Sequence, residues 1–137
     1  MSVASLRARL LERGFAADDV DGVVARLTRD GTLDDRRTAT AAAHLEGAIR
    51  LRGRRRVLQK VRALGIEPDV ARAAVDNLFE EIDETALLDR AIAKRLKGMD
   101  PSSLDRAAMA RLVRGLVAQG FPPDQIFRRL RASDDED

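Results

Sequence analysis

Apolar residues recur at the same distances from three glycines, Gly14, Gly65 and Gly120, which lie 51 and 55 residues apart. Each glycine has an apolar residue eight and four positions before it, and one and ten positions after it. These residues are Leu6, Val57 and Leu112; Leu10, Val61 and Leu116; Phe15, Ile66 and Phe121; and Val24, Val75 and Leu130. Residues four apart share one face of a helix. The pattern therefore predicts three copies of one helical unit.

Each glycine is expected to end one helix and to turn the chain into the next. A glycine after a helix readily adopts the left-handed conformation of the C′ position, and the apolar residue that follows can pack back on the helix. Pro68 and Pro123 suit the first turn of the second helix, where a missing N–H is tolerated. Asp18, Asp69 and Asp124 favour the positive end of that helix.

Two further helices are predicted between these units. The segment TLDDRRTATAAAHLEGAIRL starts a helix near Asp34 that runs towards Leu51, and DETALLDRAIAKRLK starts one at Asp83 that ends before Gly98. The expected fold is all-α, with about eight helices in tandem three-helix, helix-turn-helix-like repeats arranged in an elongated, curved stack. The predicted divisions are 1–32 with two helices, 33–82 and 83–132 with three each, and a disordered acidic tail at 133–137.

Composition narrows the possible functions. The absence of cysteine excludes a disulfide framework, a thiolate zinc site and a cysteine nucleophile. No long apolar run indicates a secretory signal or a membrane span, so we expect a soluble, cytoplasmic protein without a membrane partner. The net charge of +2 rises to +6 without the four acidic residues 134–137. The pI near 9.6 is weak evidence for nucleic-acid binding, since few groups of this chain titrate near neutral pH.

The stretch IRLRGRRRVLQKVRALGI, residues 49–66, contains seven basic residues and no acidic one. A helix that begins after Gly53 buries Val57, Leu58, Val61 and Leu64 and leaves the basic side chains exposed. Such a face is often merely solvated, but adjacent positive charges without acidic neighbours favour an anionic partner. Phosphates and carboxylates are equally suitable partners for arginine. The candidate contacts are Arg50, Arg52, Arg54, Arg55, Arg56, Lys60 and Arg62.

Three more basic residues, Lys94, Arg95 and Lys97, lie near the end of another predicted helix. They either extend the basic surface or complement the negative end of that helix. Asp34 and Asp35 resemble an acid pair, but adjacent helical residues diverge by about 100°, so helix capping is the simpler interpretation. His44 has no second ligand at metal-binding spacing, and no phosphate-loop, zinc or calcium motif is present. We therefore predict neither an enzyme nor a metal or cofactor site.

Four segments together resemble the RecX family, whose members regulate the RecA recombinase. They are LLERGF; DGTLDDRRTA, with Gly31, Leu33, Asp34, Asp35 and Arg37; GRRRVLQKVRALGI, with Gly53, Arg54, Val57, Leu58, Gly65 and Ile66; and RLVRGLVAQGF, with Arg111, Leu112, Leu116, Gly120 and Phe121. The resemblance covers nearly the whole chain. It implies tandem three-helix repeats without a catalytic centre, which bind the RecA filament on DNA and inhibit its ATP hydrolysis and strand exchange.

This sequence departs from the family pattern in two places. The family's first repeat has another helix before the point where this chain begins, and Thr38 stands where an aromatic residue is common. We expect a monomer that binds a RecA filament through the ten basic residues named above, with direct DNA contact left open. The alternative is a helix-turn-helix protein that acts on DNA directly. The acidic second helices of the first two units oppose it, since only the third has a basic set, Arg128, Arg129 and Arg131.

Overall fold

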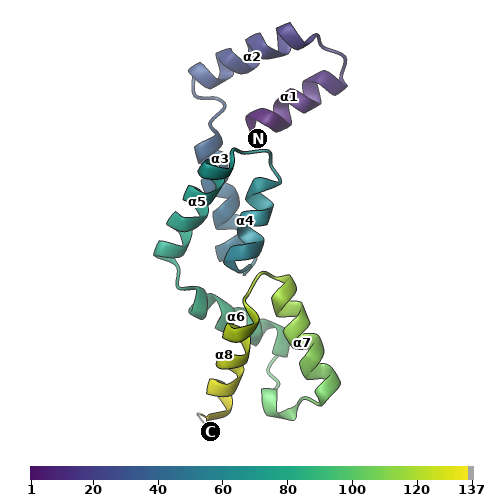
Figure 1. Ribbon diagram of the computed structural model, residues 1–137, viewed down its shortest axis with the longest axis vertical. Helices are drawn as coiled ribbons and strands as arrows, with labels where there is room; N and C mark the ends of the chain where they lie inside the picture. The colour runs from purple at the N-terminus through teal and green to yellow at the C-terminus, as the bar shows by residue number, and fades with distance from the viewer. Residues whose placement is uncertain (136–137) are drawn as a thin grey trace.

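The computed structural model describes residues 1–135, which form an elongated stack of helices without any strand (Figure 1). The all-α fold with eight α-helices is confirmed. The helices are α1 (Val3–Glu12), α2 (Ala17–Arg29), α3 (Asp35–His44), α4 (Arg54–Arg62), α5 (Pro68–Glu81), α6 (Glu84–Leu96), α7 (Arg106–Ala118) and α8 (Pro123–Asp135). A π-helical turn, η1 (Leu45–Ile49), follows α3, and a 3-10 turn, η2 (Pro101–Ser103), precedes α7.

The helices pack in three successive groups, which we call unit one (α1 and α2), unit two (α3 to α5) and unit three (α6 to α8). The division of the chain at residues 32 and 82 stays a prediction. Helix α8 runs to Asp135 and so includes the first three residues, 133–135, of the expected tail. Residues 136–137 of that predicted tail lie outside the described part of the chain.

Unit two is built around small side chains. Ala39 and Ala43 of α3 are fully buried against α4 and α5, because residues four apart lie on one face of the helix and alanine permits close approach. The register derived from the glycines places Val57, Val61 and Ile66 in the same core, and all three are buried. The expected partners Leu58 and Leu64 are only partly buried at its edge.

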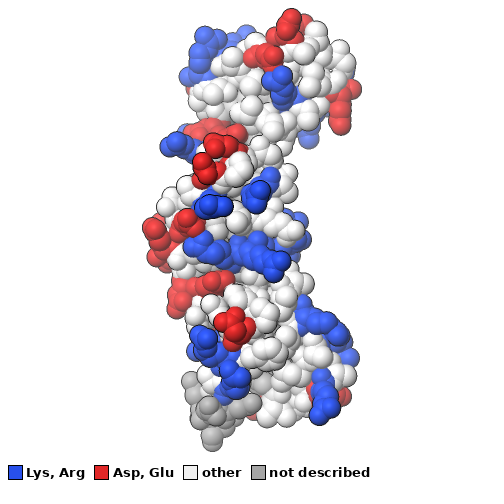
Figure 2. Space-filling model, viewed as in Figure 1, with Lys and Arg blue, Asp and Glu red and all other residues white. Residues whose placement is uncertain are grey.

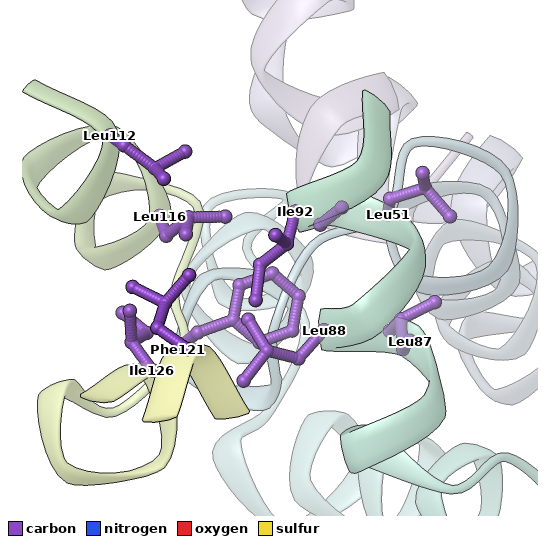
Figure 3. Packing of buried hydrophobic residues seen from close by; sticks show 10 residues of the cluster. Leu51, Leu87, Leu88, Ile92, Leu112, Leu116, Phe121 and Ile126 are labelled. Carbon is purple, nitrogen blue, oxygen red and sulfur yellow. The ribbon is translucent and has the colours of Figure 1, made fainter. Parts of the chain in front are cut away.

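Unit three has larger core residues. Figure 3 shows the Phe121 ring among Leu88 and Ile92 of α6, Leu116 of α7 and Ile126 of α8. Helix α6 buries Leu87, Leu88, Ala91 and Ile92 in this core. Asp83 caps its first turn by accepting a hydrogen bond from the Thr85 N–H at 3.0 Å. The cores of units two and three are connected, since Leu51, which follows α3, is buried in the core of unit three.

Unit one has the same sequence pattern but little core. Among its helical residues only Val20 is buried, and Leu6, Leu10 and Val24 are partly exposed. Phe15 was expected to pack back like its counterparts, but 55% of it is exposed, against 4% of Ile66 and 2% of Phe121. The physical reason is that α3 and α6 cover those counterparts, whereas no described helix covers Phe15.

The same joint connects successive units. All three register glycines have positive φ, as predicted for C′ positions. The turn at Gly65 rests on the start of α1, where the Ser2 hydroxyl donates to the Leu64 carbonyl at 2.5 Å. The turn at Gly120 rests on the start of α4, where the Gly53 N–H donates to the Gln119 carbonyl at 2.8 Å. The Gly65 and Gly120 turns therefore each dock on the start of the helix that precedes the glycine turn of the previous unit, α1 and α4 respectively.

The segment predicted as one helix from Asp34 to Leu51 is interrupted. Helix α3 gives way at His44 to the π-helical turn, and Leu51 has a φ of 56°. A leucine in this left-handed region is strained by about 1–2 kcal/mol. Tertiary packing explains the change, because the turn buries Gly47 against Leu78 and directs the Leu51 side chain into unit three. The sequence pattern contained no sign of this break.

Candidate anion-binding surface

The junction between units two and three brings the two predicted basic segments together. An open hollow of about 690 Å³, the α6–α7 hollow, lies between the end of η1 and helices α6 and α7. Its basic lining residues come from three separate parts of the chain. They are Arg50 and Arg52; Lys94, Arg95 and Lys97; and Arg111.

A second open hollow of about 770 Å³, the α4–α7 hollow, lies between α4 and the end of α7. Arg55, Arg56 and Arg62 line it, together with Gln59 and small or apolar residues. Gln119 lines the first hollow and the next residue, Gly120, lines the second, so the two hollows adjoin at this turn. Among the residues that the structure describes, no acidic one lines either hollow. We call the nine basic residues of the two hollows the junction surface.

Figure 2 shows the charge distribution on one face of the molecule. Lys and Arg side chains form a band across the middle, near α4, whereas acidic side chains gather beside it over α5. On this face, positive charge is therefore concentrated near α4 and negative charge over α5. A separated band of positive charge attracts anionic partners over longer distances than alternating charges do.

Eight of the ten predicted cations lie in the junction surface, five in the α6–α7 hollow and three in the α4–α7 hollow. Arg54 lies in neither. Its guanidinium forms an ion pair with Asp76 of α5 and lies over the Phe79 ring, 5.5 Å from the centroid, while the backbone N–H of Arg54 donates to the Glu84 carboxylate. The half-buried Lys60 also lines neither hollow. The acid-free sequence had suggested that the basic side chains of this stretch lack internal partners. For Arg54 this expectation is wrong, because Asp76 lies on another helix.

Three members of the junction surface are held by neighbouring groups. Arg50 forms an ion pair with the buried Glu46 at 2.7 Å. Arg56 donates to Gln59 at 2.7 Å. Arg95 donates to the Gln119 side chain at 2.5 Å and to the Gly115 carbonyl at 3.2 Å.

The other six members have no ion-pair or hydrogen-bond partner within residues 1–135. They are Arg52, Arg55, Arg62, Lys94, Lys97 and Arg111. Six free cations around two acid-free hollows leave much of the positive charge unneutralised. Such a surface can bind an anionic partner without first breaking internal ion pairs.

Arg111 is the one basic residue of the junction surface that was not among the predicted site residues. It stands nine positions before Gly120, and Arg56 stands nine positions before Gly65. The repeat register therefore contained a signal for Arg111, because equivalent positions occupy equivalent places on the middle helix of each unit. Gln119 was also missed, and no local motif marks it.

The acidic residues considered as a site serve other purposes. Asp34 caps its own helix by accepting from the N–H groups of Arg36 and Arg37, as predicted, and Asp35 accepts from the Val3 N–H at the start of α1. The pKa of Asp30 is lowered, chiefly by the hydrogen bond from the Thr32 side chain. This shift belongs to an exposed turn outside the junction. Hydrogen bonds from Ser102, first from its backbone N–H, likewise lower the pKa of Asp100 in another turn.

The described residues contain no cluster of three His, Asp or Glu side chains that could hold a metal ion. His44 is exposed at the end of α3. In residues 1–135, no helix is long and apolar enough to cross a membrane. The basic hollows are therefore the features on which we base a functional assignment.

Comparison with known proteins gives a consistent result. The chain is 29% identical over 126 residues to the regulatory protein RecX of Trichlorobacter lovleyi, covering 90% of this chain and 80% of that protein. It is 35% identical over 111 residues to the regulatory protein RecX of Treponema pallidum, covering 80% of this chain and 68% of that protein. No protein-family model and no solved structure match.

Proposed function

The chain belongs to the RecX family of regulatory proteins, and from this premise we propose that it binds a RecA filament on DNA and limits the filament's ATP hydrolysis and strand exchange. The observation that carries this proposal is the junction surface. It combines six cations that have no ion-pair or hydrogen-bond partner among the described residues with two hollows that no described acidic residue lines. A nucleoprotein filament offers both phosphates and carboxylates to such a surface.

The proposed mechanism is occupancy of the filament. An elongated stack of helical units presents one long surface, so it can contact several subunits of a filament at once (Figure 1). Once the first contact forms, each further contact is intramolecular, and weak contacts then add to strong binding. A protein bound in this way opposes the movements that accompany ATP turnover.

Direct sequence-specific recognition of DNA is less well supported. Among the helices that follow a glycine turn, only α8 was expected to have a charge suitable for DNA binding. Two of its three arginines, however, are paired. Arg129 donates to both oxygens of Asp89 at 2.8 and 2.7 Å, and Arg128 lies 3.8 Å from Asp124. An arginine that already binds a carboxylate contributes less to phosphate binding. The junction surface, which lies on other helices, is the better candidate for the anionic contact.

The test is a titration of this protein into the single-stranded-DNA-dependent ATPase reaction of RecA from the same organism. We expect inhibition at concentrations well below those that coat bare DNA, measured in parallel by anisotropy of a labelled oligonucleotide. Inhibition only at DNA-saturating concentrations would mean that the protein merely competes for DNA. No inhibition at either concentration would contradict the proposal.

A further inference from the structure

The α6–α7 hollow has the features of a built site rather than of a chance accumulation of charge. Six basic residues from three segments line it: Arg50, Arg52, Lys94, Arg95, Lys97 and Arg111. Long basic side chains on one helix commonly point away from each other into solvent. Here residues from three segments, 14 to 61 positions apart in the chain, border the same hollow, which requires the tertiary fold.

The backbone that carries two of these arginines is fixed. Leu51, between Arg50 and Arg52, keeps a φ of 56° because its side chain is buried in the core of unit three. Its carbonyl accepts a hydrogen bond from the Gln119 side chain at 3.0 Å, and the Arg52 N–H donates to the Glu46 carbonyl at 3.0 Å. Strained conformations that the surrounding structure enforces are concentrated at functional sites.

Gln119 connects two walls of the hollow. Its amide nitrogen donates to the Leu51 carbonyl, and its amide oxygen accepts from the Arg95 guanidinium. The backbone carbonyl of Gln119 accepts a hydrogen bond from the Gly53 N–H. The wall that carries Arg52 and the wall that carries Arg95 are therefore held in a fixed relation before any ligand binds, which lowers the entropy lost on binding.

Four cations of the hollow are left for an external ligand. Glu46 neutralises Arg50 from outside the lining, and Arg95 is engaged with Gln119 and Gly115. In contrast, Arg52, Lys94, Lys97 and Arg111 have no partner in residues 1–135. Lys94 and Lys97 were also candidates for complementing the end of α6, but their side chains donate no hydrogen bond to carbonyls of that helix in the described structure.

We propose that the α6–α7 hollow is a binding site for phosphate groups, either those of a nucleic-acid strand or those of a nucleotide. Successive phosphate groups of one strand or one nucleotide are covalently linked, so a single ligand can contact several of these cations at once, whereas the carboxylates of a protein partner are separate side chains. Arginine binds phosphate through paired hydrogen bonds and lysine binds it as a point charge. This inference deepens the proposed function, and it rests on that function only for the source of the phosphate.

The lining also determines how such a ligand is recognised. No aromatic residue lines the hollow, so bases have no ring on which to stack. Within the described part of the chain, no acidic or amide acceptor other than Gln119 lines it either. Binding through phosphates alone is independent of base sequence and falls steeply as salt concentration rises.

The experiment measures binding to the full chain by titration calorimetry at low salt, with no RecA present. The probes are inorganic triphosphate, a 20-nucleotide oligo(dT) and a ten-residue polyglutamate peptide. The test variant is Arg52→Ala/Arg111→Ala. The matched control is Arg72→Ala/Arg90→Ala, which removes two exposed arginines that line neither hollow and have no partner in the described residues.

We expect at least one phosphate probe to bind more tightly than polyglutamate. The affinity of that probe should fall at least about tenfold in the test variant and stay within about twofold in the control. Tighter binding of oligo(dT) than of triphosphate would identify a nucleic-acid strand as the source of the phosphate. Tighter binding of triphosphate would identify a nucleotide. Absence of phosphate binding, equal losses in both variants, or tighter binding of polyglutamate would overturn the proposal.

This binding experiment and the RecA ATPase titration together separate the two proposals. Phosphate binding that depends on Arg52 and Arg111, combined with no effect on RecA ATPase, would retain the site and reject the proposed function. Inhibition of RecA together with no phosphate binding would retain the function and reject the site.

Discussion

Units one and three contain the same apolar register but use it differently. In unit three, Leu112, Leu116, Phe121 and Leu130 are all buried. In unit one the equivalent Leu6, Leu10 and Val24 are partly exposed and Phe15 is largely exposed. The difference is α6, which covers the helix pair of unit three, whereas no described helix covers α1 and α2 in this way. A repeat register thus predicts which residues face inward, but burial requires the third helix.

The largest difference in stability between the two units is expected at the aromatic residue that follows the glycine. Phe121→Ala should lower the free energy of unfolding by about 3–5 kcal/mol, because it leaves a cavity in a closed core. Phe15→Ala, at the equivalent position of unit one, should change it by less than about 0.5 kcal/mol. Chemical denaturation followed by circular dichroism measures both variants. Equal losses would show that Phe15 is buried in solution.

Substitution of the register glycines should also cost more stability in unit three than in unit one, by a smaller margin than for the aromatic residues. Gly120→Ala places a Cβ 2.5 Å from the backbone nitrogen of Arg56, whereas a Cβ at Gly14 has no atom within 4 Å. Both substitutions incur about 1–2 kcal/mol from the left-handed backbone, and only Gly120→Ala adds about 1–3 kcal/mol for the overpacked joint. Thermal unfolding of the two variants gives the comparison. A larger loss for Gly14→Ala would contradict the described joint.

Ser2 tests how unit one is attached. Its buried hydroxyl accepts from the Ser5 N–H at 3.1 Å and donates to the Leu64 carbonyl of unit two. Ser2→Ala should lower local stability by about 1–2 kcal/mol, because it removes a helix cap and the bond to unit two. Hydrogen exchange should accelerate in α1 and α2 and stay unchanged in α6 to α8. Uniform acceleration would mean that the three units unfold together.

A new cap should give the smallest effect, in the opposite direction. Helix α2 has Ala16 at its N-cap position and so lacks a side-chain cap, whereas α7 is capped by Asp105, which accepts from the Ala108 N–H at 2.7 Å. Ala16→Ser should stabilise α2 by about 0.5–1 kcal/mol. Slower hydrogen exchange within α2 alone is the expected result. No change in α2 would indicate that its start is not the point where unit one opens.

The parts of this fold that could be predicted are those that residues adjacent in the sequence determine. The glycine turns, the prolines at the starts of α5 and α8 and the caps at Asp34 and Asp83 depend on local backbone chemistry, and all of them are present. The break at η1 could not be predicted, because it depends on packing between Gly47 and Leu78 and on burial of Leu51 in another unit.

The candidate site shows the same division. The basic stretch was evident in the sequence, but its division between two hollows depends on the Gln119–Gly120 turn, more than 50 residues away. Arg54 and Arg55 are adjacent in the sequence, yet Arg54 pairs with Asp76 and Arg55 lines a hollow. Only tertiary contacts separate an arginine that stabilises the fold from one that is available to a partner.

The central claim is that the junction surface, and not unit one, provides the cationic contact with the filament. Two variants with the same change in charge test it. One carries Ala at Arg52, Arg55, Arg62 and Arg111, and the other carries Ala at the exposed Arg9, Arg13, Arg26 and Arg29 of unit one. The measurement is the concentration of each variant that halves the DNA-dependent ATPase rate of RecA.

We expect the junction variant to require at least about tenfold more protein than the unchanged chain, because four charged contacts are lost. The unit-one variant should remain within about threefold, since it changes only the long-range attraction. Equal losses in both variants, or a larger loss in the unit-one variant, would contradict the assignment of the contact to the junction.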